Sequence, residues 1–180
     1  MSQPQIPEMV KLIMSIFSRE AEYISRAIEV LSGPFGPLDW ISPQIPFDRT
    51  RYYEREMGWP LLRRFVSFQN LIDPGSLAEV KLQTNQIELS FSPEGKRLVN
   101  IDPGYISLER LILATGKNYA HRVYLSKGIY ADLTFIYSKG SFVPLRWTYP
   151  DYRDEKVIVW FNKIRERYKE QIRGKLCQGA

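Results

Sequence analysis

The sequence predicts an α+β fold, a single domain with a mainly antiparallel or mixed β-sheet. Over residues 9–101, strand and helix patterns alternate in the order β-α-β-β-α-β, which is the order of a ferredoxin-like sandwich. Extra strand-like runs separated by tight turns follow as far as residue 153, and a long amphipathic run then predicts a C-terminal helix packed on the sheet. The 180 residues fit one domain, with flexible tails expected at 1–8 and 176–180.

The first predicted unit is a strand at residues 10–17 followed by a helix that begins near Ser18, whose hydroxyl can cap it. Apolar residues at helical spacing give this helix one buried face, formed by Ile24, Ala27, Ile28 and Leu31. The dipeptide Gly33-Pro34 is expected to end it. The segment 34–46 is rich in proline and glycine and is interpreted as a loop, either a lid or a connection.

The second unit begins with residues 50–57, which alternate without an apolar face and are interpreted as an edge strand, or alternatively as an exposed functional segment. Residues 61–72 form a stronger strand pattern, and Asp73-Pro74 starts the next helix. The inner face of that helix is predicted to carry Leu77, Val80, Thr84, Ile87 and Phe91, with Glu79, Lys81 and Glu88 on other faces. A strand at 97–101 completes the unit.

A hairpin is the clearest element of the second half. Two strand-like runs at 120–125 and 129–136 flank a three-residue loop at 126–128, whose Gly128 can adopt a left-handed conformation. The resulting register pairs Arg122 with Asp132, Tyr124 with Tyr130 and His121 with Leu133. One face is then apolar with His121 at its edge, and the other face carries the Arg122/Asp132 and Tyr124/Tyr130 pairs.

Three further elements are predicted around this hairpin. The tetrapeptide at 102–105, Asp-Pro-Gly-Tyr, has the composition of a type II turn. Residues 111–115 form a short apolar run typical of a central strand buried on both faces. Residues 154–173 form a helix with a core-facing stripe of Val157, Trp160, Phe161, Ile164, Tyr168 and Ile172.

Composition indicates a cytoplasmic protein that does not cross a membrane. The chain has one cysteine, which excludes an intramolecular disulfide framework, and it lacks a signal-like segment and any run of about 20 apolar residues. The net charge of +5 permits anionic partners, RNA among them. Much of the excess lies in the C-terminal helix, where basic residues equally suit a solvated face. The oligomeric state does not follow from the sequence.

Several kinds of chemistry lack their usual motifs. One cysteine and one histidine make a zinc site unlikely. The stretch at 114–117, ATGK, lacks the earlier glycine of a phosphate-binding P-loop and places its hydroxyl residue before the lysine. The dinucleotide-binding GxGxxG motif and the GxSxG elbow of hydrolases are also missing.

The remaining candidates form a cluster of acidic, basic and aromatic residues. Asp102, His121 and Asp132 are the candidate catalytic residues, and Asp102 and Asp132 could hold Mg²⁺ or Mn²⁺, which prefer oxygen ligands. The candidate ligand-binding residues are Lys117, Arg122, Tyr124, Tyr130, Tyr149, Asp151, Glu54, Glu88 and Asn100. Such a set suits a phosphorylated or nucleotide-like anion. The alternative is structural: Arg122 and Asp132 form a cross-strand ion pair, His121 borders the core, and Asp102 caps its own turn.

The segment WTYPDYR at 147–153 has two interpretations. Its aromatic residues beside Arg153 could stack on the bases of single-stranded RNA. More commonly such a segment packs the last strand onto the C-terminal helix. The sequence therefore leaves three hypotheses, in descending order: a ligand-binding protein or enzyme, an RNA-binding module, and a structural or assembly domain.

Several separate stretches, in order, resemble one known family. YYEREMG, LIDPGSLAEVKLQTNQIE, NIDPGY, LATGKNYAHRVYL, GIYADLT and WTYPDY are similar to signature stretches of prokaryotic proteins known as domain of unknown function 4416. The resemblance covers about residues 11–168 and implies a single-domain cytoplasmic protein without an established activity. Some members carry a GTP-binding label, which the missing P-loop does not support here. The motif set maps onto Tyr53, Glu54, Glu56, Asn85, Glu88, Asn100, Asp102, Tyr105, Lys117, His121, Arg122, Asp132, Tyr149 and Asp151.

Overall fold

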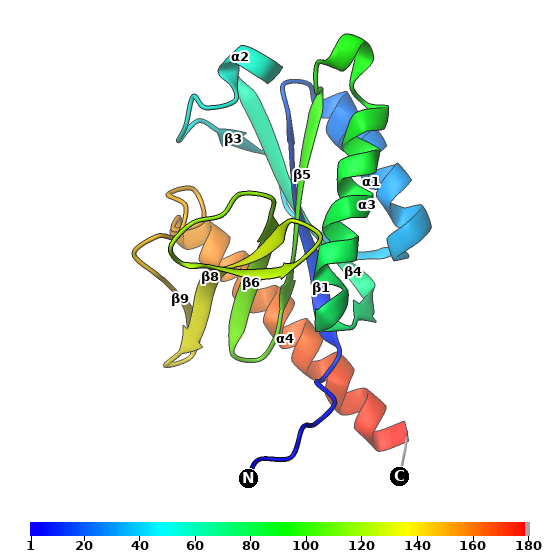
Figure 1. Cartoon of the computed structure of the whole chain (residues 1–180), viewed down its shortest axis with the longest axis vertical. Coiled ribbons are helices and arrows are strands. Elements are labelled where there is room, and N and C mark those ends of the chain that lie inside the picture. Colours follow the sequence, from blue (N-terminus) through cyan, green and yellow to red (C-terminus); the bar gives the residue numbers. More distant parts are fainter. Residues whose placement is uncertain (179–180) are drawn as a thin grey trace.

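A computed structural model of the chain, which describes residues 1–178, has one antiparallel sheet with helices on both faces (Figure 1). The strands follow the order β2-β4-β1-β5-β6-β8-β7, with β3 paired to β4 and β9 paired to β8. The predicted α+β fold is therefore confirmed. None of the helices within residues 1–178 is long and apolar enough to cross a membrane.

The first half has the strand order of a ferredoxin-like unit. The strand β1 (Val10–Ser18) lies between β4 (Leu61–Ile72) and β5 (Val99–Ile106), and β2 (Leu38–Ile41) lies outside β4. The helices α1 (Ala21–Phe35) and α3 (Leu77–Ser90) pack on the same face, on a core made mainly of aliphatic side chains. Their positions agree with the split β-α-β arrangement predicted from the sequence.

The second strand of that unit is not where the sequence placed it. Residues 50–57, expected to be an edge strand, contain the short helix α2 (Glu54–Met57), while the segment expected to be a loop holds β2 and β3 (Ile45–Phe47). The first helix continues through Gly33-Pro34 and ends before Gly36, whose φ of +85° gives the left-handed turn. Strands of three or four residues among prolines leave too little periodicity to detect.

The opposite face of the sheet is covered by α4 (Glu155–Gln178), as predicted. Its core is aromatic: Tyr152 stacks on Phe161 with ring centroids 5.8 Å apart, and Phe65 and Phe135 pack around them. The helix begins close to the predicted position but extends through residue 178, so residues 176–178, expected to be a tail, are helical. Residues 179–180 lie outside the described part, and residues 1–8 form no helix or strand.

The second half extends the sheet with β6 (Arg110–Thr115), β7 (Arg122–Ser126), β8 (Ile129–Ser138) and β9 (Ser141–Pro144). β6 is central, as predicted. The hairpin register is confirmed for Arg122/Asp132 and Tyr124/Tyr130, but the loop has two residues, Lys127 and Gly128, both with positive φ. Leu125 forms a bulge that absorbs the extra residue.

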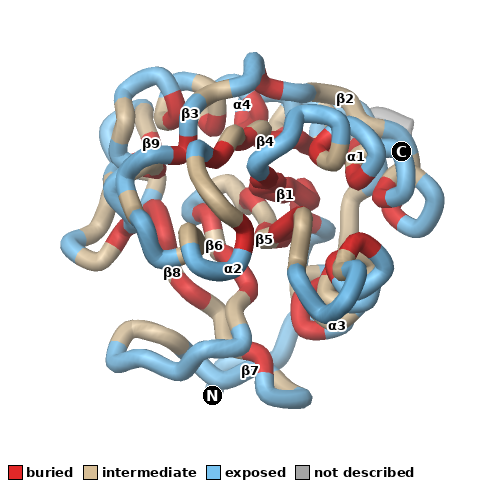
Figure 2. Tube along the Cα trace, turned by 90° about the horizontal axis from the view of Figure 1, so that it is seen from above, coloured by how far each residue is buried: buried red, intermediate tan, exposed pale blue. Residues whose placement is uncertain are grey.

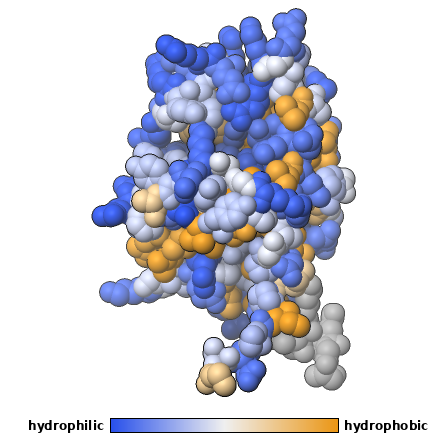
Figure 3. Space-filling view, in the orientation of Figure 1, coloured by the Kyte–Doolittle hydropathy of each residue, from blue (hydrophilic) through white to orange (hydrophobic). Residues whose placement is uncertain are grey.

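The predicted apolar face of β7 does not reach the core. β7 is the last strand at its edge of the sheet, and Val123 there is 68% exposed. Figure 3 shows other hydrophobic side chains at the surface over β6, β8 and β9, where Ile136 and Val143 are among the exposed residues. His121 precedes β7 and does not pair with Leu133.

The sheet divides between β5 and β6 (Figures 1 and 2). β5 pairs with β1 along its whole length but with β6 only from Gly104 to Ile106. The Asp-Pro-Gly stretch predicted to be a turn therefore lies within β5. Pro103 is tolerated because its missing N–H falls on the side where β6 has not yet joined. Gly104 is required because a Cβ there would lie 2.3 Å from the carbonyl oxygen of Ile112 in β6.

Candidate functional site

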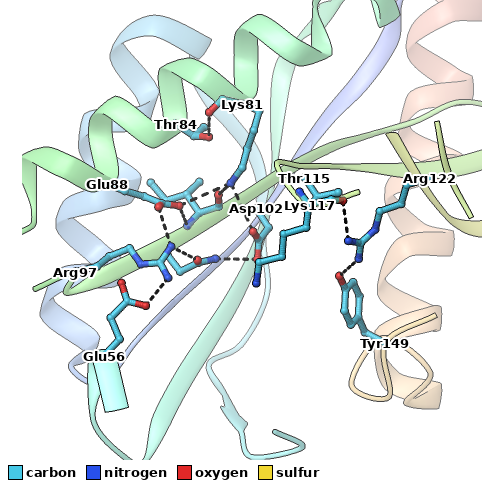
Figure 4. A network of polar contacts seen from close by, with 12 residues as sticks. Glu56, Lys81, Thr84, Glu88, Arg97, Asp102, Thr115, Lys117, Arg122 and Tyr149 are labelled. Atoms are coloured by element: carbon cyan, nitrogen blue, oxygen red, sulfur yellow. Dashed lines mark hydrogen bonds and ion pairs between the residues drawn. The ribbon is translucent and has the colours of Figure 1, made fainter. Parts of the chain in front are cut away.

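Two groups of polar side chains lie on either side of the division between β5 and β6, and Figure 4 shows the first group together with Arg122 and Tyr149 of the second. The first, here called the Asp102 cluster, consists of Glu56, Lys81, Glu88, Arg97, Asn100 and Asp102. The second, the Asp132 cluster, consists of His121, Arg122, Asp132 and Tyr149. The surface of this end of the molecule, around α2, is mainly hydrophilic (Figure 3).

In the Asp102 cluster, two side chains of α3 form the backbone hydrogen bonds with β5 that a neighbouring strand would otherwise form. Lys81 Nζ donates to the backbone carbonyl of Ile101 at 2.8 Å, and the Ile101 N–H donates to Glu88 Oε1 at 2.6 Å. These backbone groups of β5 have no hydrogen-bond partner in β6. Burying them without partners would cost about 1–3 kcal/mol each, so Lys81 and Glu88 allow the sheet to divide without that cost. The prediction that Lys81 and Glu88 lie away from the core is wrong.

Arg97 connects the rest of this cluster. Its guanidinium donates to Glu88 Oε2 at 3.1 Å, to Asn100 Oδ1 at 2.8 Å and to Glu56 Oε2 at 2.8 Å. Asn100 in turn donates to Asp102 Oδ2 at 2.8 Å, and Lys81 Nζ lies 3.7 Å from Asp102 Oδ1. Burial raises the pKa of Glu88, against the opposing effect of Lys81. The three carboxylates, which come from α2, α3 and β5, are thus held in place by two cations, Lys81 and Arg97.

A buried arginine lies beneath the Asp102 cluster. Arg63 in β4 is 4% exposed, forms an ion pair with Asp151, and has its guanidinium 3.8 Å from the ring centre of Phe47. Burial lowers the pKa of Arg63, while nearby Tyr152 and Asp102 act in the opposite direction. Asp151, a predicted ligand-binding residue, is therefore engaged with Arg63 and anchors its segment to the sheet.

The Asp132 cluster converges on one buried carboxylate. Arg122 Nε donates to Asp132 Oδ2 at 2.9 Å, and His121 Nε2 lies 3.3 Å from the same oxygen. The register places His121 and Arg122 on opposite faces, and His121 reaches Asp132 because it lies just outside the strand. Its ring stacks on Trp147 with centroids 5.0 Å apart. Three of the predicted site residues are therefore brought into contact.

A shallow, open hollow of about 620 Å³ lies beside this cluster, lined by Tyr119, Ala120, His121, Arg122, Arg146, Trp147 and Tyr149. Arg122 Nη2 donates to Tyr149 Oη at 2.7 Å, and Arg122 Nη1 donates to the Lys117 carbonyl at 2.9 Å. The guanidinium is thus fixed on three sides. Arg146 makes no ion pair within residues 1–178, so the hollow carries excess positive charge.

Tyr149 and Lys117 connect the two clusters. Burial raises the pKa of Tyr149, and both Asp132 and Asp102 add to that effect, so the tyrosine lies near both carboxylates. Lys117, just after β6, donates from Nζ to Tyr52 Oη at 2.8 Å, on the opposite side of the division. Figure 4 shows Lys117 extending toward Asp102.

Other predicted site residues lie apart from these clusters. Glu54 forms an exposed ion pair with Arg51, and Tyr124 packs edge-on against Tyr130 at 5.3 Å on the β7–β8 hairpin. Asp102 and Asp132 belong to different clusters. Among residues 1–174, whose side chains the structure describes, no three His, Cys, Asp or Glu side chains are grouped to hold a metal ion.

The sequence missed Lys81, Arg97, Arg63 and Arg146. Lys81, Thr84 and Glu88 share one stripe of α3 because their spacing of three and four residues is helical. That stripe is a signal that a polar face meets the sheet. Arg63, Arg97 and Arg146 carry no such signal, because each depends on contacts between distant segments.

The WTYPDYR segment packs mainly as a structural strap. Tyr152 is buried against Phe161 of α4, and Trp147 Nε1 donates to the Leu133 carbonyl at 2.8 Å. Basic residues of α4 are also partly engaged in packing: Arg165 lies 3.4 Å from the ring centre of Tyr137 and donates to the Leu108 carbonyl. Tyr149 remains 42% exposed at the hollow.

Comparison with known proteins gives one result. The family model described as domain of unknown function (DUF4416) matches residues 8–168, nearly the whole chain. Neither the curated proteins nor the solved structures contain a match. The family resemblance predicted from the motifs is therefore confirmed, and the chain belongs to the DUF4416 family.

Proposed function

We propose that the protein binds a phosphorylated or nucleotide-like anion in the hollow beside the Asp132 cluster. The observation that carries the proposal is the convergence of His121 and Arg122 on Asp132 at the wall of a hollow that also contains Arg146. Guanidinium groups match the geometry of phosphate oxygens, and a guanidinium already fixed by a carboxylate loses little further freedom on binding.

Charge and shape support this reading. Arg122 is compensated by Asp132, whereas Arg146 has no carboxylate partner within residues 1–178. Lys117, at the edge of the same region, contacts a tyrosine hydroxyl and forms no ion pair there. The rings of Tyr119, Trp147 and Tyr149 add flat apolar surface against which a base or sugar can pack.

Turnover of the ligand is an extension of this proposal. His121 lies within reach of a buried carboxylate, the arrangement that a general acid or base uses to keep its orientation. Asp132 and Asp102 remain the candidate ligands for Mg²⁺ or Mn²⁺. Such an ion would need phosphate oxygens from the ligand to complete its coordination, as these ions commonly do.

The test is a thermal-shift and calorimetric panel on the whole chain. The probes are inorganic phosphate, pyrophosphate, AMP and ATP, each with and without Mg²⁺ or Mn²⁺. A probe at about 100 times its dissociation constant adds roughly 2.7 kcal/mol of stability, or several degrees of Tm. Binding should weaken at least about tenfold in Arg146→Ala, because one charge-assisted hydrogen bond is lost.

The matched control is Arg110→Ala, which removes an exposed arginine at the far end of β6. It should respond as the wild type does. The proposal would be overturned if no probe changed the Tm of the folded wild-type protein. It would also be overturned if Arg146→Ala and Arg110→Ala weakened binding equally.

An RNA-binding role is the second candidate, because exposed Tyr119 and Tyr149 lie beside Arg146. This role predicts an affinity for single-stranded RNA that falls steeply with salt concentration, and little change in Tm with the small anions. The same panel extended to an oligonucleotide at 50 and 200 mM salt separates the two candidates.

A further inference from the structure

We propose that the Asp102 cluster is a second subsite for the same ligand, which takes the uncharged, hydroxyl-bearing part of a sugar phosphate. This inference rests on the proposed function, in which the hollow beside Asp132 takes the phosphate. It assigns a ligand class, a phosphorylated sugar or polyol.

The first argument is the difference in charge between the two regions. Around Asp102, the cations Lys81, Arg97 and Arg63 face four carboxylates, those of Glu56, Glu88, Asp102 and Asp151. A second phosphate would be repelled there. The hollow has the opposite balance, with Arg122 and Arg146 against Asp132 alone. A ligand that covers both regions is therefore anionic at one end and neutral at the other.

The second argument is the unused capacity of the Asp102 carboxylate. Its Oδ2 accepts one hydrogen bond from Asn100, and its Oδ1 lies 3.7 Å from Lys81 Nζ, which is beyond hydrogen-bond distance. The side chain is 32% exposed toward the division of the sheet. A carboxylate has about four acceptor positions, so Asp102 can still accept from two neighbouring hydroxyls of a sugar.

The third argument is a pair of buried hydroxyls beside it. Ser15 lies directly opposite Asp102 in the β1–β5 register, and Tyr152 approaches the same place from the strap. Both residues are at most 2% exposed, and their two hydroxyl groups interact with each other, while neither meets strict hydrogen-bond geometry with any described side chain. Buried polar groups are nearly always satisfied, so two hydroxyls that have only each other would gain partners from a polar ligand bound at the neighbouring carboxylate.

The two regions adjoin at Tyr149. Its hydroxyl accepts from Arg122 in the Asp132 cluster, and its ring centre lies 6.3 Å from that of Tyr152 beside Asp102. Lys117 extends from the Asp132 side toward Asp102 (Figure 4). One ligand can therefore contact Arg122 with its phosphate and Asp102 with its hydroxyls.

The experiment compares two phosphate monoesters: methyl phosphate, which has no sugar, and ribose 5-phosphate, which adds a hydroxyl-bearing sugar ring. Dissociation constants are measured by calorimetry for the wild type, Asp102→Asn and Tyr152→Phe. Ribose 5-phosphate should bind the wild type at least about tenfold more tightly than methyl phosphate, and this ratio should fall close to one in Asp102→Asn.

Tyr152→Phe keeps the proposal testable if Asp102→Asn folds poorly. Removing a hydroxyl whose one neighbour is the Ser15 hydroxyl should change Tm little but should still reduce the ratio severalfold. Glu170→Gln, an exposed carboxylate on α4, is the control and should keep the wild-type ratio.

The outcomes separate the two proposals. A wild-type protein that binds methyl phosphate and ribose 5-phosphate equally overturns the Asp102 subsite but leaves the phosphate hollow standing. An undiminished ratio in both Asp102→Asn and Tyr152→Phe does the same. If neither probe binds the wild type, the proposed function fails and the subsite fails with it.

Discussion

The Asp102 and Asp132 clusters are built in different ways, although both centre on a carboxylate at the same division of the sheet. The Asp132 cluster is local: His121, Arg122 and Asp132 come from one hairpin and its entry, within twelve residues of the chain. The Asp102 cluster combines side chains of α2, α3 and β5 that are separated by more than forty residues. One cluster needs only a hairpin, whereas the other needs the whole first half of the fold.

The difference also lies in what each cluster does for the backbone. In the Asp102 cluster, Lys81 and Glu88 bond to the main chain of Ile101 and so support the sheet itself. In the Asp132 cluster, the polar groups bond mainly to one another at an edge hairpin. We therefore expect the first cluster to contribute to global stability and the second chiefly to local order.

The largest effect should come from Lys81→Met. It removes the donor to the Ile101 carbonyl and leaves Glu88 buried with one cation fewer, so we expect a loss of about 3 kcal/mol in the free energy of unfolding. Chemical denaturation measures it. Lys127→Met, which breaks an exposed ion pair with Glu79, is the control and should cost less than about 1 kcal/mol. If the two variants lose the same free energy of unfolding, Lys81 supports the fold no more than an exposed ion pair does, and the expected difference between the clusters is wrong.

A smaller effect is expected from Asp132→Asn, about 1.5 kcal/mol, because Arg122 loses a charged acceptor and His121 loses a charged neighbour near the edge of the sheet. Combined with Lys81→Met, the two losses should add within about 0.5 kcal/mol, since Lys81 and Asp132 share no hydrogen-bond partner. The double-mutant cycle is measured by chemical denaturation without ligand. A coupling well above that limit would mean that the clusters already act as one unit in the free protein.

The smallest and most specific effect concerns pH. Burial raises the pKa of Glu88 above its ordinary value of 4.5, so the folded state keeps a proton that the unfolded state has lost. The free energy of unfolding of the wild type should therefore fall as pH rises from 4.5 through the folded pKa. Glu88→Gln, which can still accept from the Ile101 N–H, should lack this decline.

The pH measurement compares denaturation curves of the wild type and Glu88→Gln between pH 4.5 and 7.5. Glu79→Gln, an exposed glutamate of the same helix, should follow the wild-type profile. Parallel profiles for the wild type and Glu88→Gln would show that the charge of Glu88 is fully compensated by Lys81 and Arg97.

The contrast between local and distant contacts also explains which elements the sequence could predict. The long strand β4 and the helix α4 follow from periodicity within single segments, and both are confirmed; the hairpin register is confirmed for Arg122/Asp132 and Tyr124/Tyr130 but not for the pairs next to the loop or at His121. The short strands β2 and β3 exist because β4 offers them an edge, so their own residues carry little signal. The helical turn at α2 is likewise fixed by its surroundings.

The prediction of a turn at the Asp-Pro-Gly stretch was wrong for a related reason. Its composition is that of a turn, and only the partner strand β1, together with the departure of β6, makes an extended conformation favourable. The contacts of the candidate site also differ in whether the sequence could predict them. The contact of Arg122 with Asp132 could be anticipated from the hairpin, whereas the predicted register put His121 on the other face, and Lys81 and Arg63 act through segments that a sequence does not place together.

The two side chains that bond to Ile101 have a further consequence for solubility. A strand with free backbone groups is a template on which another chain can add a strand, and such edges promote aggregation. In β5 that template lies inside the sheet, at the division, where it is closed by an ammonium and a carboxylate. Lys81 and Glu88 thus close this part of β5 against pairing with another chain, although β6 does not cover it.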